Sequence, residues 1–176
     1  MKEGKVNRFK VDENGYTADG YRRLEPESKK SMYLGNIIGI IISAIVILAV
    51  AHYCEPWVGD HYGLVRTLFY VLLAVIIVYA VAEPEITYRR YRYRMDDDKI
   101  EVRRGIIYIS HVMVPIERVH QVDVSEGPIN RMYGLANVNI TTAGGVVTIE
   151  YLKEDVAESI ASKLNENVVK LLKERD

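Results

Sequence analysis

Two apolar stretches separated by twelve residues dominate the hydropathy pattern of this chain. Residues 34–50 hold eleven Ile, Leu or Val side chains, with Asn36 and Ser43 as polar interruptions. At about −0.3 to −0.6 kcal/mol each, these eleven contribute roughly −3 to −7 kcal/mol toward membrane insertion. The second stretch covers about 24 Å of helix and reaches a full span when the residues just before it are included. The pattern predicts transmembrane helices over residues 31–54 and 67–82.

A buried helical hairpin in a water-soluble protein and a signal peptide are the two alternatives to a membrane hairpin. The first conflicts with the absence of charge through both stretches, which leaves neither helix a polar face to show to water. The second conflicts with the thirty mostly polar residues before the first stretch, and cleavage after Ala51 would still leave the second helix. We therefore expect a multi-pass protein of the cell membrane.

Basic residues flank the predicted hairpin at both of its ends. Those before the first helix are Arg22, Arg23, Lys29 and Lys30, and those after the second are Arg89, Arg90, Arg92 and Arg94. The connecting residues 55–66 hold a single Arg. Because Lys and Arg concentrate in cytoplasmic segments, we expect both termini in the cytoplasm, with residues 55–66 forming an external loop. The polar residues 1–30 then form a cytoplasmic arm, mobile until Leu24.

Beyond residue 82 the hydrophobic period changes from that of a helix to that of strands. Glu83 and Pro84 are expected to end the second helix, because proline breaks the helical hydrogen-bond ladder. Alternation then predicts short strands at residues 90–95, 100–103, 106–114, 121–124, 137–142 and 146–151, and 3.6-residue spacing predicts a helix over 156–172. Residues 83–176 are therefore expected to form a mainly-β barrel of six or seven antiparallel strands with a C-terminal α-helix.

Three short motifs in this region carry a family resemblance. They are Pro115 with Arg118 to Gln121, then Gly127-Pro128 with Arg131 and Gly134-Leu135-Ala136, and finally the run Thr142 to Gly145. With them, residues 24–169 resemble the bacterial pleckstrin-homology-like (PH-like) domain family of the YdbS type. The resemblance implies a PH-like barrel anchored by two membrane helices, commonly alongside a longer relative that carries several copies of the domain. It implies no enzymatic activity. His120 departs from the family pattern, and the strand after Gly145 is short.

The basic residues beside the membrane are the first candidate site. On a strand, Arg90, Arg92 and Arg94 would share one face, which with Arg89 could contact anionic lipid; their plainer role is to set the topology. Specific phosphoinositide binding is disfavoured, because the following turn, residues 96–98, holds three aspartates.

The residues of the family motifs are expected to be structural. They are Pro115, Arg118, Gln121, Gly127, Pro128, Arg131, Gly134, Leu135, Gly144 and Gly145. Arg118 is expected to pair with Glu117 or Asp123 or to cap a turn, and Arg131 to tie loop carbonyls together. The glycines are expected at turns or bulges, where a positive φ favours glycine.

Composition and motif spacing predict no catalytic, metal or cofactor site. The four histidines lack metal-ligand spacing, no serine lies in a nucleophile elbow, and Cys54 is the single cysteine. Residues 83–176 carry 14 basic and 16 acidic side chains, a net charge of −2 that disfavours nucleic-acid binding. We therefore expect neither an enzyme nor a protein with a small-molecule substrate.

These expectations combine into a membrane-anchored docking module that contacts the lipid bilayer and assembles with another membrane protein or a second copy of itself. Envelope maintenance or stress protection is the setting expected for such an assembly. One alternative is a module that senses anionic lipid through the arginines. A second alternative, an accessory subunit of a transport complex, rests on Gly35 and Gly39, whose spacing can allow close helix contact.

Overall fold

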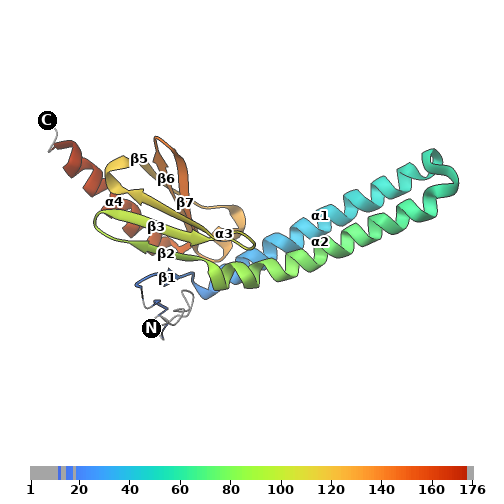
Figure 1. The fold of residues 1–176 in the computed structure, drawn as a ribbon, viewed down its shortest axis with the longest axis horizontal. Helices are drawn as coiled ribbons and strands as arrows, with labels where there is room; N and C mark the ends of the chain where they lie inside the picture. The colour runs from blue at the N-terminus through green and yellow to red at the C-terminus, as the bar shows by residue number, and fades with distance from the viewer. Residues whose placement is uncertain (1–11, 13–14, 18, 174–176) are drawn as a thin grey trace, which may run out of the picture.

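The structure is a computed structural model that describes residues 12, 15–17 and 19–173 of the chain. Helices α1 (Pro26–Val58) and α2 (Tyr62–Arg90) form an antiparallel hairpin, joined by the 3₁₀ turn Gly59–His61. The hairpin projects away from a β-rich domain (Figure 1). At 33 and 29 residues the helices are about 50 and 43 Å long, so both extend beyond a hydrocarbon core of about 30 Å.

The surface of the hairpin is apolar on all sides. Ile45 of α1 is 63% exposed and Val78 of α2 is 68% exposed, and the most apolar windows of the two helices are only 11% and 6% buried. A soluble protein would bury such helices in its core, whereas here the side chains project outward where lipid would solvate them. The predicted membrane hairpin is confirmed, and each helix is longer than the span assigned to it from sequence.

Helix α2 does not end at Glu83 and Pro84, and this prediction was wrong. Proline has no N–H, so the carbonyl of Ala80, four residues earlier, lacks its helical donor. The side chain of Asn36 on α1 supplies one, since its Nδ2 donates to the Ala80 carbonyl at 2.8 Å and to Glu83 Oε2 at 3.1 Å. The helix therefore continues for another turn and a half, to Arg90.

The β domain contains two antiparallel sheets and two helices. The first sheet has the order β1 (Arg22–Arg23), β2 (Arg92–Met95), β3 (Lys99–Arg104), β4 (Ser110–Pro115), and the second the order β5 (Val119–Ser125), β6 (Leu135–Thr142), β7 (Gly145–Lys153). A 3₁₀ turn (Ile116–Arg118) joins the sheets, α3 (Pro128–Met132) follows β5, and α4 (Glu154–Lys173) ends the described chain. This arrangement confirms the predicted PH-like fold class, although residues 106–109 form a loop rather than part of a strand.

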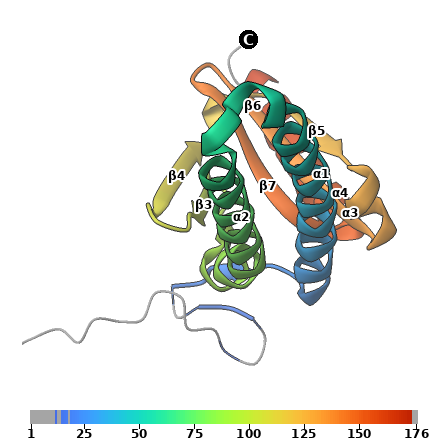
Figure 2. The same ribbon diagram turned by 90° about the vertical axis from the view of Figure 1, so that its right-hand side faces the viewer.

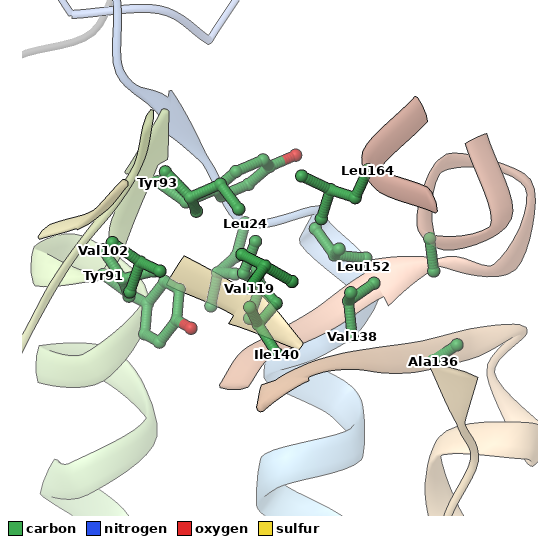
Figure 3. Packing of buried hydrophobic residues seen from close by; sticks show 14 of the residues in the cluster. Leu24, Tyr91, Tyr93, Val102, Val119, Ala136, Val138, Ile140, Leu152 and Leu164 are labelled. Carbon is green, nitrogen blue, oxygen red and sulfur yellow. The ribbon is translucent and has the colours of Figure 1, made fainter. Parts of the chain in front are cut away.

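The apolar core lies between the two sheets and α4 (Figure 3). Val102 from the first sheet and Val138, Ile140 and Leu152 from the second are at most 1% exposed. Leu164, on the predicted apolar face of α4, is completely buried against them. The period-2 and period-3.6 patterns thus identified the inward-facing positions of β6 and α4 correctly.

The N-terminal arm is folded onto the β domain from residue 15 onward, except for residue 18, which lies outside the described residues. Strand β1 pairs with β2, and Tyr21 and Leu24 are each 1% exposed. The predicted mobility up to Leu24 is therefore wrong for residues 15–17 and 19–23. Its bearing on residues 1–11, 13 and 14 also lies outside the described residues. The sequence of this segment is mostly polar, so it did not indicate that Tyr21 and Leu24 belong to the core.

The contact between Asn36 and Ala80 leads to a test by a double-mutant cycle. We expect Asn36→Ala to lower the free energy of unfolding of the hairpin by about 1 kcal/mol, because the Ala80 carbonyl loses its donor at the edge of the membrane. Pro84→Ala restores a backbone N–H at residue 84, so the cost of Asn36→Ala should shrink in that background. Unfolding in mixed micelles, followed by circular dichroism, measures all four proteins. Equal costs in both backgrounds would contradict this account.

Candidate functional site

The β domain has two ends that differ in their relation to the hairpin. At the proximal end, β2 follows α2 after the single residue Tyr91, and α3 packs against α1, where Ser31 Oγ donates to Asn130 Oδ1 at 2.6 Å. The distal end carries the β6–β7 turn, the turn after β4 and the C-terminal part of α4, all directed away from the hairpin (Figure 1). Viewed from the tip of the hairpin, β3 and β4 lie on the side of α2, whereas α3 and α4 lie on the side of α1 (Figure 2).

A groove of about 400 Å³ lies at the distal end, between β4 and the β6–β7 turn. Its walls are Met113, Val114, Pro115, Glu117, Arg118, His120, Thr142, Ala143 and Gly144. Three of the motif residues, Pro115, Arg118 and Gly144, are separated in the sequence and meet here. We call this surface the distal groove.

The distal groove offers three kinds of contact. Among the described residues, strand β4 pairs only with β3 and leaves its other edge unpaired, and Met113 on this strand is 51% exposed. Arg118 is exposed, and its side chain has no hydrogen bond or ion pair within the described part of the chain. The predicted pair with Glu117 or Asp123 does not form, and Asp123 instead accepts hydrogen bonds from Gln121 Nε2 at 2.9 and 3.0 Å. The groove thus combines a free backbone edge, an apolar side chain and a free guanidinium.

The other motif residues lie at the proximal end, around α3. Gly127 precedes this short helix and Pro128 is its first residue, where proline's missing N–H costs no hydrogen bond. Leu135 is 1% exposed in the core, as expected of a structural residue. Arg131 is exposed, and the described residues give its side chain no hydrogen bond, so the predicted tie to loop carbonyls is absent.

The motif glycines divide by backbone conformation. Gly134, with φ +62°, and Gly145, with φ +127°, occupy the region that favours glycine, as predicted. Gly127 has φ −76°, and Gly144 is not among the residues of positive φ. The backbone conformation therefore does not explain why these two positions hold glycine.

The four arginines of the predicted lipid-facing set do not share a face. Arg89 and Arg90 belong to α2, where Arg89 Nε donates to Glu85 Oε1 at 2.6 Å, and Arg90 donates to the carbonyl of Ile106. Arg92 is only 3% exposed, and Arg94 pairs with Asp96 at 2.7 Å. The prediction of one exposed stripe was wrong because α2 continues past Pro84.

Arg92 lies between the arm, where Arg23 is its strand partner, and the end of α2. Its Nη1 donates to the carbonyls of Tyr91 at 2.6 Å and Tyr88 at 3.2 Å. Desolvation lowers the pKa of its guanidinium from the ordinary value. Its side chain is therefore inaccessible to lipid headgroups.

A buried carboxylate, Glu101, organises the outer face of the first sheet. Its side chain is 4% exposed, accepts a hydrogen bond from the Tyr21 hydroxyl, and lies 2.9 Å from Lys99 Nζ and 2.7 Å from His111 Nε2. Burial alone would raise the pKa of Glu101, but these hydrogen bonds outweigh it and hold the pKa at about 2. Arg103 stacks over the Tyr21 ring at 3.6 Å. Together these contacts fasten the arm to the sheet.

Sequence reasoning missed this cluster, because Glu101 alternates with the apolar Ile100 and Val102 and so lies at an outward-facing position of its strand. The signal that could have found it is the aromatic Tyr21 within an otherwise polar arm.

The aspartates of residues 96–98 form a turn at the distal end, where Asp97 pairs with Lys163 of α4 at 3.0 Å. They face away from the hairpin, so they do not oppose headgroups of the membrane that holds the chain. Among the described residues, no group of three His, Cys, Asp or Glu side chains could hold a metal ion.

Comparison with known proteins yields a family model and two related sequences. A model described as a bacterial PH domain matches residues 24–168. UPF0699 transmembrane protein YdbS of Bacillus subtilis (strain 168) is 28% identical over 148 residues, covering 81% of this chain and 89% of that protein. UPF0699 transmembrane protein YdbT of the same strain is 27% identical over 100 residues, covering 57% of this chain and 20% of that protein. No solved structure matches significantly.

The low pKa of Glu101 predicts a pH dependence of stability. A carboxyl group whose pKa falls from about 4.5 in the unfolded chain to about 2 in the folded chain stabilises the fold above pH 4.5. That contribution is lost as the pH falls from about 5 to 2. We expect Glu101→Gln to reduce the free energy of unfolding of the β domain by about 1 to 3 kcal/mol at pH 7, and by roughly half of that or less at pH 3.

Thermal unfolding of the full chain in detergent at the two pH values measures this difference. Glu126→Gln is the matched control, because Glu126 is exposed and has no hydrogen-bond partner among the described residues. A pH-independent effect of Glu101→Gln would show that the ionised carboxylate is not what stabilises the arm.

Proposed function

Because this chain belongs to the bacterial PH domain family and carries that domain on a transmembrane hairpin, we propose that it is a non-enzymatic docking module for other membrane proteins. The partner is a membrane protein that carries a domain of the same kind, either a paralogue or a second copy. The flanking Lys and Arg residues support a cytoplasmic position for the β domain and both termini.

The distal groove is the observation that carries this proposal. It gathers residues from two separate motifs on the face directed away from the bilayer, where a second protein has access. An extended segment of the partner would pair with the free edge of β4, cover Met113 and place a carboxylate against Arg118. Main-chain pairing supplies affinity in this mode, and the side-chain contacts supply specificity.

The pair of related sequences supports the choice of partner. YdbS and YdbT are two proteins of one organism, and each resembles this chain. The chain matches only a fifth of the length of YdbT, so that protein has extensive regions beyond the shared segment. By this analogy, the partner that we propose for this chain is a longer membrane protein with a related segment.

The glycine-based alternative, an accessory subunit of a transport complex, gains no support from the hairpin. A Cβ added to Gly39 would have no neighbour within 4 Å among the described residues, and one added to Gly35 would approach Ile129 of α3. The spacing of these glycines therefore does not mediate close approach of α1 to α2. Polar contacts between the helices come instead from Asn36, and from Lys29, which pairs with Glu85.

Charge reversal in the distal groove tests the docking proposal. We expect Arg118→Glu to reduce co-purification of the membrane partner from mild detergent at least about tenfold, because a charge-assisted hydrogen bond becomes a repulsion. The matched control is Arg131→Glu, since Arg131 is equally free of hydrogen bonds among the described residues but lies at the proximal end. Mass spectrometry of cross-linked native membranes identifies the partner.

Recovery of only lone monomers of the unaltered protein, with no cross-linked membrane protein, would contradict the docking function itself. Equal losses from the two arginine variants would instead contradict the location of the interface at the distal groove.

A further inference from the structure

The loop between β3 and β4 exposes an unusual number of apolar side chains. Ile107 is 83% exposed, Tyr108 is 88% exposed and Ile109 is 55% exposed, and the three are consecutive. Exposed apolar clusters of this kind mark sites that contact a membrane or another protein. We refer to residues 106–109 as the apolar loop.

The apolar loop lies at the proximal end, beside the end of α2. Strand β2 runs away from α2, and β3 returns antiparallel to it, with Arg103 opposite Arg92. The residues after β3 therefore emerge toward the hairpin. The contact that confirms this position is the hydrogen bond from Arg90, at the end of α2, to the carbonyl of Ile106.

The dimensions of α2 bring the tip of this loop to the membrane surface. The uncharged part of α2 ends at Ala82, and Arg90 lies seven residues beyond Glu83, which is about 10 Å along the helix axis. The headgroup layer of one leaflet extends roughly 5 to 8 Å beyond the hydrocarbon. The remaining distance of about 2 to 5 Å is shorter than an Ile or Tyr side chain, so the side chains of Ile107 and Tyr108 cover it although the loop is bent. The tip therefore reaches the headgroup layer.

The shape of the apolar loop is set in advance by Gly105. This residue has φ +131°, and a Cβ added to it would lie 1.8 Å from the carbonyl oxygen of Tyr108. Only glycine permits this close approach, which turns the chain sharply and holds Ile107 and Tyr108 outward. A preformed loop loses less conformational entropy on contact than a flexible one.

The charges around the apolar loop suit a lipid surface, although they do not dominate the contact. Arg90 donates to the Ile106 carbonyl and Arg104 lies just before the loop in the sequence. Glu85 pairs with Arg89, next to Arg90, and Glu150 lies 3.7 Å from Arg104. The net charge is therefore small, and the apolar side chains supply the main attraction. Tyrosine favours the level of the headgroups because its ring is amphipathic.

From these observations we propose that the apolar loop inserts into the leaflet beside the β domain, as a third membrane contact in addition to the two helices. This contact fixes the orientation of the domain against the bilayer, with the distal groove outward. It is independent of the docking function, so either proposal can fail without the other.

Depth-dependent quenching of tryptophan fluorescence tests the insertion on the full chain in lipid nanodiscs. The single native tryptophan is removed by Trp57→Phe, and Tyr108→Trp places the probe in the loop. We expect lipids brominated near the top of the acyl chain to quench this probe at least twofold. Val146→Trp in the same background is the control, since Val146 is 60% exposed on β7, next to the distal turn, and should not be quenched.

Unquenched fluorescence at residue 108, or equal quenching at residue 146, would overturn the proposal. Shielding of residue 108 only after addition of a membrane extract, without quenching by lipid, would assign the loop to a protein partner and also overturn it. Should the tryptophan variant fail to fold, Ile107→Cys with Cys54→Ala carries a nitroxide label instead. Its accessibility to oxygen should then exceed its accessibility to a water-soluble nickel complex, and the reverse order would contradict insertion.

Discussion

The hydrogen bond from Asn36 to the carbonyl of Ala80 determines how the membrane hairpin joins the β domain. Pro84 removes the helical donor of that carbonyl, and near the hydrocarbon core no water reliably replaces it. Because α1 provides the donor, α2 continues to Arg90, and only Tyr91 separates it from β2. Tyr91 is itself 1% exposed in the core, so helix and sheet are joined without a flexible linker.

This rigid junction gives the two ends of the β domain different environments. Helix α2 is followed almost directly by β2 of the first sheet. Helix α3, which connects two strands of the second sheet, packs against α1, so the domain contacts both helices of the hairpin. The apolar loop lies at the proximal end, and the groove that contains Arg118 lies at the distal end. For the proposed docking function a fixed orientation is favourable, because the proposed partner lies in the same membrane.

The cluster around Glu101 fixes the position of the arm in addition to stabilising the fold. Removing a carboxylate from water is costly, and the hydrogen bonds to Glu101 outweigh that cost only when all of its partners are in place. Here the partners come from the arm and from strands β2, β3 and β4, and they match only when the arm lies in one place. The cluster thus specifies where β1 adds to the first sheet, next to the start of α1.

Local patterns in the sequence were sufficient for the membrane hairpin, for most strands and for α4. Burial in lipid requires a continuous apolar run, and burial of one face in a two-layered core imposes a period of about 2 or 3.6 residues. Glycine at residues 134 and 145 and the core positions of β6 also followed from local rules. Three features depended on residues distant in the sequence. Helix α2 continues through Pro84 because Asn36 on α1 donates to the Ala80 carbonyl. The arm is ordered because β1 pairs with the edge of the first sheet and Tyr21 donates to Glu101. The distal groove exists because β4 and the β6–β7 turn meet. The hydrophobic period of a segment carries no information about contacts with distant segments, so these three features could be found only in the tertiary structure.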